Sequence, residues 1–332
     1  MVLNELRSDD KIWGIFVREE EYRPSGLDMY GRCPYYLSQN RSILEPSVSE
    51  FLIKNGAKYE YPGGKKFAVC LTHDIDYVNI PGQKKRHKVL DYLKGASGVK
   101  KRMFDNFRDI ISLEEGYGAK SSFYFLALEK GEEDYNYDIR ELENELCHIS
   151  DKGWEVGLHG GHNAYDSLKN IKVQKKRIEK VLGKKVIGYR NHYLRFKVPD
   201  TWELLKDAGF KYDTTFGYAD MIGFRNGMCH PFKPFNLNTN QEIDILEIPL
   251  IVMDGTLFQY MKLDNKTAWD YIKLLIDKTE RYNGVLTILW HNNNMFGEHL
   301  KLYEKILDYC RRQGAWMACG EDVWRHWTEV TK

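Results

Sequence analysis

The 332-residue sequence lacks the features that mark several large classes of protein. No segment approaches the roughly 20 apolar residues of a membrane span, and residues 1–10 lack the long apolar core of a secretion signal. The six cysteines are scattered and none forms a CxxC pair, which argues against a disulfide framework. We therefore expect reduced thiols and a cytoplasmic location.

An excess of charge of one sign is also missing. Lysine and arginine number 49 against 48 aspartates and glutamates, so the formal net charge is +1. Such a balance gives no global field that would favour nucleic acid or a membrane surface, and we expect no nucleic-acid partner. One local exception is the basic stretch 84–102, which is either a rim for an anionic substrate or lipid headgroup, or simply a solvated helical hairpin.

Strand-like apolar runs alternate with helical patterns along most of the chain, although no fixed-period repeat is present. The runs are 67–72, 122–128, 154–158, 186–190, 211–215, 245–252, 285–290 and 315–319. The helical patterns cover 165–182, 202–208, 267–282 and 298–312, and a glycine follows each of them. This alternation predicts an α/β fold with a parallel sheet, and the number of units favours a barrel over an open sheet.

The N-terminal segment and one long connection differ from this pattern. Residues 1–60 carry short aromatic and polar runs, and they are too short for a core of their own. We expect them to form an N-terminal cap on a barrel domain that covers 61–332. Residues 78–118 separate the first two predicted strands and exceed an ordinary loop, so they are expected to be a helical insertion over one end of the barrel.

The most informative motif is Thr72-His-Asp-Ile-Asp76, which directly follows a buried-strand pattern. Alternation along an extended chain aims Asp74 and Asp76 the same way. Two carboxylates aimed together are unfavourable unless a metal ion or a shared proton compensates their charge. A metal is the better interpretation because the chain also offers histidines that follow predicted strands.

Further polar groups follow other predicted strands. They are, in chain order, His159 with His162, Arg190 with His192, Asp213, and His291. A single histidine after a strand is more often structural than functional. In a (β/α) barrel, however, active residues lie at the carboxyl ends of the strands, and all of these groups are predicted to lie there. Together they favour an active site.

In order and spacing these groups resemble the motifs of the polysaccharide deacetylase (NodB-like, carbohydrate esterase) family, over roughly residues 65–325. More narrowly, they resemble the branch whose first motif is Thr-His-Asp-x-Asp. The resemblance implies a distorted (β/α) barrel of about seven strands and one divalent metal ion. It also implies hydrolysis of an N-acyl group from an amino sugar. Zinc is the default metal, with cobalt, nickel or iron as alternatives.

The resemblance also implies roles for individual residues. Asp74 matches the catalytic base, and Arg190 matches the arginine that pairs with it. His291, in Leu-x-His, matches the general acid, and Asp213 matches the acid that orients this histidine. His159 matches the first histidine that binds the metal.

Two departures from the family pattern leave the remaining ligands open. Ile75 stands where the family has its metal-binding aspartate, so we move that role to Asp76. Asn163 stands where the second ligand histidine is usual. His162 and His192 are the alternatives, and His192 is preferred because Arg-x-His-Tyr is the form associated with this branch.

Substrate contacts are predicted on three segments. The backbone N–H near Tyr193 matches the oxyanion donor of the family. Arg225 or His230, in the aromatic and basic loop 223–235, is predicted to touch the substrate, the alternative being a purely structural loop. Trp290 is a candidate for stacking on a sugar face.

The expected substrate is an acetylated or formylated amino sugar, nucleotide- or lipid-linked, used in surface-polysaccharide assembly. Two alternatives stay open at this point. One is a metal-dependent hydrolase of a non-sugar amide. The other is a non-catalytic carbohydrate-binding barrel. The departures from the family pattern at Ile75 and Asn163 favour this alternative.

Overall fold

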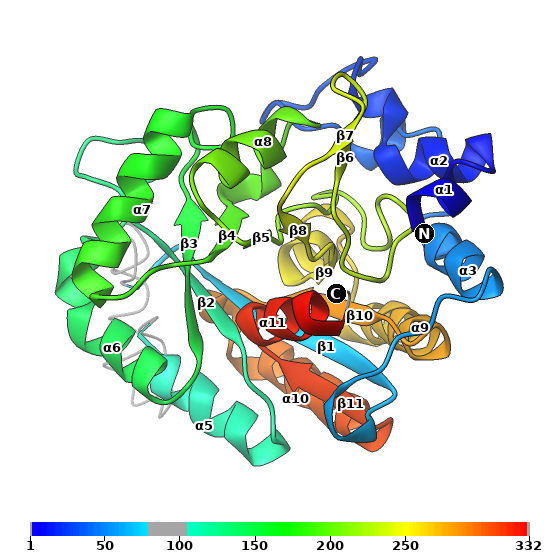
Figure 1. The fold of residues 1–332 in the computed structure, drawn as a ribbon. Coiled ribbons are helices and arrows are strands. Elements are labelled where there is room, and N and C mark those ends of the chain that lie inside the picture. The colour runs from blue at the N-terminus through cyan, green and yellow to red at the C-terminus, as the bar shows by residue number, and fades with distance from the viewer. Residues whose placement is uncertain (1, 79–104, 331–332) are drawn as a thin grey trace.

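The computed structural model describes residues 2–78 and 105–330, and a curled parallel β-sheet lies at its centre (Figure 1). The strands are β1 (Phe67–Ile75), β2 (Ser122–Leu126), β3 (Glu155–Gly160), β4 (Gly188–Asn191), β5 (Tyr212–Asp213), β8 (Leu246–Glu247), β9 (Leu250–Met253), β10 (Val285–Leu289) and β11 (Ala315–Ala318). Their order is β8-β5-β4-β3-β2-β1-β10-β9, and β11 pairs with β1. Every pair in this sheet is parallel, so the predicted barrel-type α/β fold is confirmed.

The two ends of the strand order are neighbours in the chain. β8 pairs with β5 and β9 pairs with β10, yet only Ile248 and Pro249 separate β8 from β9. Such a short connection forces the sheet to curl until its outer strands come close together. The sequence predicted a single strand at 245–252. The structure divides that run at Pro249, which has no N–H for a ladder hydrogen bond.

β1 is the central strand, and both of its edges are occupied. Residues 68–72 pair with β10 along one edge, while β11 pairs with 67–70 and β2 with 72–75 along the other. With β11 and the divided run, the described sheet has nine strands rather than about seven. The carboxyl end of β1 therefore lies between β2 and β10, near the middle of the sheet.

Alternation along β1 separates the interior of the barrel from its outer face. Ala68 and Cys70 pack inside with Tyr124 and Tyr212, whereas Val69 and the other odd-numbered residues of the strand pack toward the helices. The C-terminal helix α11 (Gly320–Val330) covers the end of the barrel at which the strands begin, through residues of the same interior cluster. The candidate functional residues lie at the opposite end, where the strands finish.

Helices surround the sheet on its outer side (Figure 1). They are α5 (Phe107–Tyr117), α6 (Glu143–Asp151), α7 (Leu168–Leu182), α8 (Asp200–Asp207), α9 (Asn265–Arg281) and α10 (Gly297–Arg312). Local signals set their ends: Ser167 caps α7 by accepting the N–H of Asn170, and Gly183 ends it at φ 71°. The four predicted helices correspond to α7, α8, α9 and α10 within a few residues.

The N-terminal helices α1 (Val2–Leu6) and α2 (Asp10–Val17) lie beside the hairpin of β6 (Phe235–Asn236) and β7 (Gln241–Glu242), and α3 (Ser47–Lys54) packs against α1 and α2 (Figure 1). Their buried apolar residues belong to the same cluster as the outer face of the sheet. The cap and domain boundaries remain predictions.

The basic stretch 84–102 and most of the expected insertion 78–118 lie outside the described residues; α5 belongs to the part that is described. Within 2–78 and 105–330, the structure contains no helix that is both long and apolar enough to cross a membrane.

Candidate active site

Two acids and two histidines meet at the carboxyl edge of the sheet. Asp74 is on β1 and Asp76 directly follows it, His159 is on β3, and His192 follows β4. The Asp76 Oδ1 atom lies 3.2 Å from His159 Nε2 and 3.6 Å from His192 Nε2. One ligand atom from each of these three residues lies within 4.8 Å of the others.

Hydrogen bonds fix which nitrogen each histidine presents. His159 Nδ1 lies 3.0 Å from the Arg190 carbonyl oxygen, so it carries the proton and donates it. His192 Nδ1 donates to Asp134 Oδ2 at 3.2 Å. In the neutral form both rings therefore aim an Nε2 lone pair toward Asp76, which is the arrangement that metal-binding histidines adopt.

The residues fit a metal ion because their buried polar atoms have no other partner. Among the described residues, Asp76 Oδ1 and His159 Nε2 are buried without a hydrogen bond. A carboxylate oxygen and a nitrogen lone pair would repel each other at such short range unless a metal cation, or a proton on the imidazole, lay between them. Two ligands of a tetrahedral zinc ion lie about 3.3 Å apart, close to the separations seen here.

Charge in the cluster supports the same conclusion. Burial alone would raise the pKa of Asp76, but His192 and the other nearby histidines lower it well below its usual value. The carboxylate is therefore ionised and available as an anionic ligand. One Asp and two His would leave coordination positions open for water and substrate.

The second histidine in this cluster is His192 rather than His162. His162 Nδ1 instead lies 3.5 Å from Asp134 and 3.7 Å from Glu133. Asn163 donates to Glu133 and does not enter the cluster. His162 thus lies beside the site, next to the carboxylate that holds His192.

Asp134 is a site residue that the sequence did not reveal. It belongs to none of the motifs found in the sequence. It lies in the loop after β2, and its backbone φ is 66°. Its carboxylate accepts from His192 Nδ1 and, at 3.3 Å, from the Tyr193 hydroxyl. A carboxylate behind a ligand histidine sets the orientation of its ring.

Asp74 is held beside a buried arginine. Arg190 Nη1 lies 3.8 Å from Asp74 Oδ1, and Nη2 donates to Thr72 Oγ1 and Thr214 Oγ1, both at 3.1 Å. Arg190 is fully buried and Asp74 is 2% exposed. Asp74 Oδ1 is buried and has no hydrogen-bond partner among the described residues.

His291 completes the site, but its partner is Asp254 and not the predicted Asp213. His291 Nδ1 donates to Asp254 Oδ1 at 2.6 Å, and the His291 N–H donates to Oδ2 at 2.9 Å. Burial would lower the pKa of His291, yet Asp254 above all, together with Asp76 and Asp74, raises it to about 10. The Nε2 side of the ring faces Asp76, 3.7 Å from Oδ2.

The assignment of Asp213 is therefore wrong, and the structure gives this residue a different environment. Its carboxylate accepts from the N–H and the hydroxyl of Thr215. It also lies beside Glu247, whose pKa is raised well above its usual value by burial and by Asp213. This buried acid pair is fixed inside the fold and cannot orient His291.

The other predicted substrate contacts divide into one that reaches the site and three that do not. Tyr193 follows His192, and their rings stack with centroids 3.9 Å apart. Trp290 is completely buried and packs against Tyr303, so it cannot stack on a sugar. His230 is also fully buried, bonded to Ser49 and to backbone carbonyls.

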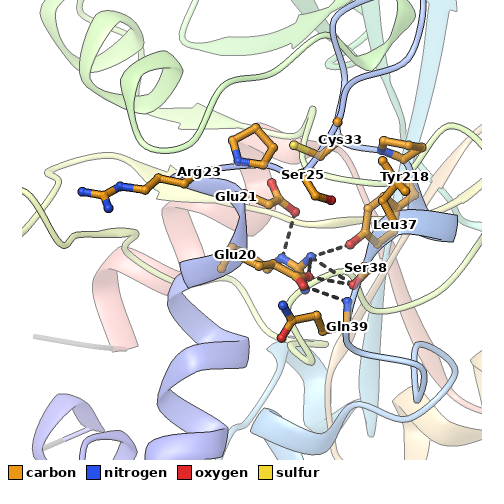
Figure 2. A pocket seen from close by; sticks show the side chains of 13 residues that line it. Glu20, Glu21, Arg23, Ser25, Cys33, Leu37, Ser38, Gln39 and Tyr218 are labelled. Carbon is orange, nitrogen blue, oxygen red and sulfur yellow. Dashed lines mark hydrogen bonds and ion pairs between the residues drawn. The ribbon is translucent and has the colours of Figure 1, made fainter.

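Arg225 is likewise wrong as a substrate contact, because it is 3% exposed and paired with Glu21. Nearby, a pocket of about 110 Å³ lies within the N-terminal segment (Figure 2). The polar groups there already pair with one another: Arg18 contacts Glu20, Ser38 and Tyr218. None of Asp76, His159 and His192 lines this pocket.

Comparison with solved structures agrees with this architecture. A protein from Mycobacterium smegmatis assigned to the polysaccharide deacetylases superposes with a TM-score of 0.60 at 17% identity, covering 83% of this chain and 95% of the other. Puue allantoinase superposes with a TM-score of 0.59 at 15% identity, over 83% of this chain and 95% of its own. No protein-family model matches the sequence, and no curated protein matches it. The structural similarity establishes the fold class of the polysaccharide deacetylases.

Proposed function

We propose that the protein is a metal-dependent hydrolase that removes an N-acyl group from an amino sugar. The observation that carries this proposal is the convergence of Asp76, His159 and His192 beside Asp74 and His291 at one edge of the sheet. An amide is a weak electrophile with a poor leaving group, so its hydrolysis needs an activated water, a stabilised oxyanion and a proton for the amine. Each requirement has a candidate group here.

The metal ion, held by the three ligands, would lower the pKa of a water molecule and polarise the substrate carbonyl. Zinc is the metal we propose, since mixed His and Asp ligation suits it, with cobalt, nickel or iron as alternatives. The remaining steps are assigned to side chains and one backbone N–H group of the protein.

Asp74 is the proposed base, which takes a proton from the attacking water. The guanidinium of Arg190, whose Nη1 lies 3.8 Å from Asp74 Oδ1, places a positive charge beside this carboxylate. His291, kept protonated by Asp254, is the proposed acid that gives its Nε2 proton to the departing amine. The backbone N–H of Tyr193 is the proposed donor to the oxyanion.

An amino sugar carrying an acetyl or formyl group is the proposed substrate, as a precursor in the assembly of a surface polysaccharide in the cytoplasm. A second candidate is hydrolysis of a non-sugar amide. The fold resembles an allantoinase about as closely as a polysaccharide deacetylase, which favours keeping this candidate. The departures at Ile75 and Asn163 do not favour a non-catalytic barrel, because Asp76 and His192 supply carboxylate and imidazole ligands in the cluster.

The proposal is tested by elemental analysis of the purified protein and of single alanine variants. We expect about one zinc ion per chain in the wild type and in His162→Ala, and loss of the metal in Asp76→Ala, His159→Ala and His192→Ala. His162→Ala is the matched control because this histidine lies beside the cluster without joining it. Equal metal content in all the variants would contradict the assignment.

Activity is then measured on acetylated and formylated amino sugars and, in parallel, on ureides and other non-sugar amides. Release of acetate or formate from the sugars, abolished in Asp74→Asn, supports the proposal. Turnover of only the non-sugar amides would favour the second candidate. Stoichiometric metal without turnover of any substrate would contradict the catalytic roles of Asp74 and His291.

A further inference from the structure

The backbone that follows His192 has a conformation that side-chain-bearing residues avoid. Tyr193 has φ 59° and Leu194 has φ 55°, two consecutive left-handed residues, neither of them glycine. Such a turn persists only where the surroundings hold it. Because it begins at a candidate metal ligand, whatever holds the turn also fixes the position of that ligand.

The N-terminal segment 28–32 supplies the contacts that hold this turn. Arg32 Nη1 donates to the Tyr193 carbonyl oxygen at 2.6 Å, and Nη2 donates to the Tyr260 hydroxyl at 3.2 Å. Its Nε donates to Asp28 Oδ2 at 2.7 Å. The guanidinium therefore spans three partners at once, and Arg32 is only 7% exposed.

Stacked rings connect the same segment with the ligand itself. The ring of Tyr30 stacks on Tyr193 with centroids 4.6 Å apart, and Tyr193 stacks on His192 at 3.9 Å. The guanidinium of Arg32 lies 4.7 Å from the Tyr30 ring centroid. A continuous column thus runs from Arg32 through two tyrosines to the imidazole of His192.

The segment is fixed on the barrel independently of these stacks. Asp28 accepts the N–H groups of Tyr30 and Arg32, both at 2.9 Å, which closes a tight local turn. Arg195 Nε donates to the Tyr30 carbonyl at 2.7 Å, and its Nη1 donates to the His162 carbonyl at 2.7 Å. These hydrogen bonds fix the conformation and position of segment 28–32, so it contacts Tyr193 in one geometry.

We propose that Arg32 is a positioning residue of the metal site: it fixes the left-handed turn at Tyr193 and thereby the ring of His192. The inference rests on the proposed function, which makes His192 a ligand and the Tyr193 N–H an oxyanion donor. The N-terminal segment is then part of the active site and more than a cover for the barrel. Asp134 binds the Nδ1 edge of the imidazole and Tyr193 stacks on its face, so His192 is constrained from two directions.

The test compares Arg32→Ala and Arg32→Lys with Arg41→Ala as the matched control. Arg41 lies in the same N-terminal segment and also donates to backbone carbonyls, those of Tyr35 and Tyr36, but it is exposed and contacts none of the site residues. The readout is titration of each metal-free protein with Co²⁺, followed by its visible absorption. Circular dichroism of each variant reports whether it is folded.

We expect Arg32→Ala to bind Co²⁺ about tenfold more weakly, with a changed visible spectrum, because residues behind a ligand histidine alter affinity on this scale. Arg32→Lys should recover only part of the affinity, since an ammonium group cannot span the three partners as a guanidinium does. Arg41→Ala should match the wild type. On an active substrate, kcat of Arg32→Ala should fall while KM stays within about twofold, because the positioned groups act in the transition state.

Two results would overturn the inference: wild-type Co²⁺ affinity and spectrum in folded Arg32→Ala, or equal loss in Arg32→Ala and Arg41→Ala. The Co²⁺ affinity and the visible spectrum are both measured with the metal alone, without a substrate. Failure to hydrolyse any N-acyl sugar would therefore contradict the proposed function while leaving the role of Arg32 decided by the Co²⁺ titration.

Discussion

His291 depends for its charge mainly on one neighbouring carboxylate, that of Asp254. Asp254 is fully buried and accepts four hydrogen bonds, from the side chain and N–H of His291, from Gly255 and from Asn294. Burial would raise the pKa of Asp254, yet the contact with His291 lowers it, so the carboxylate stays ionised. An ionised, immobile acid behind the imidazole favours the protonated ring that a general acid requires.

We predict that Asp254→Asn lowers kcat by about 10²–10³-fold with little change in KM, because the amide cannot stabilise the imidazolium of His291. The pKa of His291 should fall, so the alkaline limb of the pH–rate profile should move to lower pH. The measurement is kcat and kcat/KM against pH for both proteins. Asn294→Ala, which removes a different partner of Asp254, is the control and should retain most of the activity. An unshifted alkaline limb would contradict the assignment of His291 as the acid.

The choice between Asp213 and Asp254 shows where sequence reasoning stops at the scale of single residues. Asp213 is the last residue of one short strand and Asp254 directly follows another, and nothing local distinguishes them. The order of the sheet decides: β9, which precedes Asp254, lies beside β10, which precedes His291. β5, which carries Asp213, is separated from β10 by four other strands. Strand order arises from long-range pairing and is absent from local patterns.

At the scale of elements, the strands were predictable because they are buried on both faces and appear as apolar runs. Residues at strand ends were predictable for the same reason, since a strand boundary marks them. The loops were not predictable. Asp134 and Arg32 lie in irregular segments whose paths depend on tertiary contacts. Their contacts with His192 and Tyr193 could therefore not be predicted. Residues such as Arg225 and His230 were misjudged because loop composition does not reveal burial.

His230 joins elements instead of binding substrate, and this gives stability a pH dependence. Its Nδ1 accepts from the Ser49 hydroxyl on α3 at 2.8 Å. Its Nε2 donates to the carbonyls of Tyr282 and Asn283, just after α9, at 3.0 and 3.1 Å. Burial is the main cause that lowers the pKa of His230 to about 4.

We predict that the free energy of unfolding falls by about 2 kcal/mol between pH 7 and pH 5 through His230 alone. A histidine in the unfolded chain takes up a proton below about pH 6.5, whereas the folded protein resists protonation until about pH 4, so acid favours unfolding. Chemical denaturation at several pH values checks this. His230→Gln, which cannot titrate, should be less stable at pH 7 but should lose less stability on acidification. Parallel pH dependence of the two proteins would show that another group is responsible.

At the scale of the whole molecule, a buried ionic network ties the N-terminal segment to the barrel. Glu21 is paired with Arg225 at 2.5 Å and with Arg18 at 2.8 Å. Burial alone would raise the pKa of Glu21, but Arg225 and Arg18 lower it, so the carboxylate is charged. Arg225 also donates to the Gly217 carbonyl, and Arg18 to the Arg225 carbonyl. The network therefore joins residues about 200 positions apart in the chain.

We predict that Glu21→Gln destabilises the protein by about 3–5 kcal/mol, because it leaves two buried guanidinium groups without their shared anion. The matched control is Glu129→Gln, which breaks the surface pairs of Glu129 with Arg140 and Arg177 and should change stability by less than about 1 kcal/mol. Equilibrium unfolding in guanidinium chloride measures both. Since segment 28–32 follows this network directly in the chain, Glu21→Gln should also weaken Co²⁺ binding at temperatures where the rest of the protein is still folded. A large loss of stability with unchanged Co²⁺ affinity would mean that segment 28–32 stays on Tyr193 through its own contacts, independently of the ionic network.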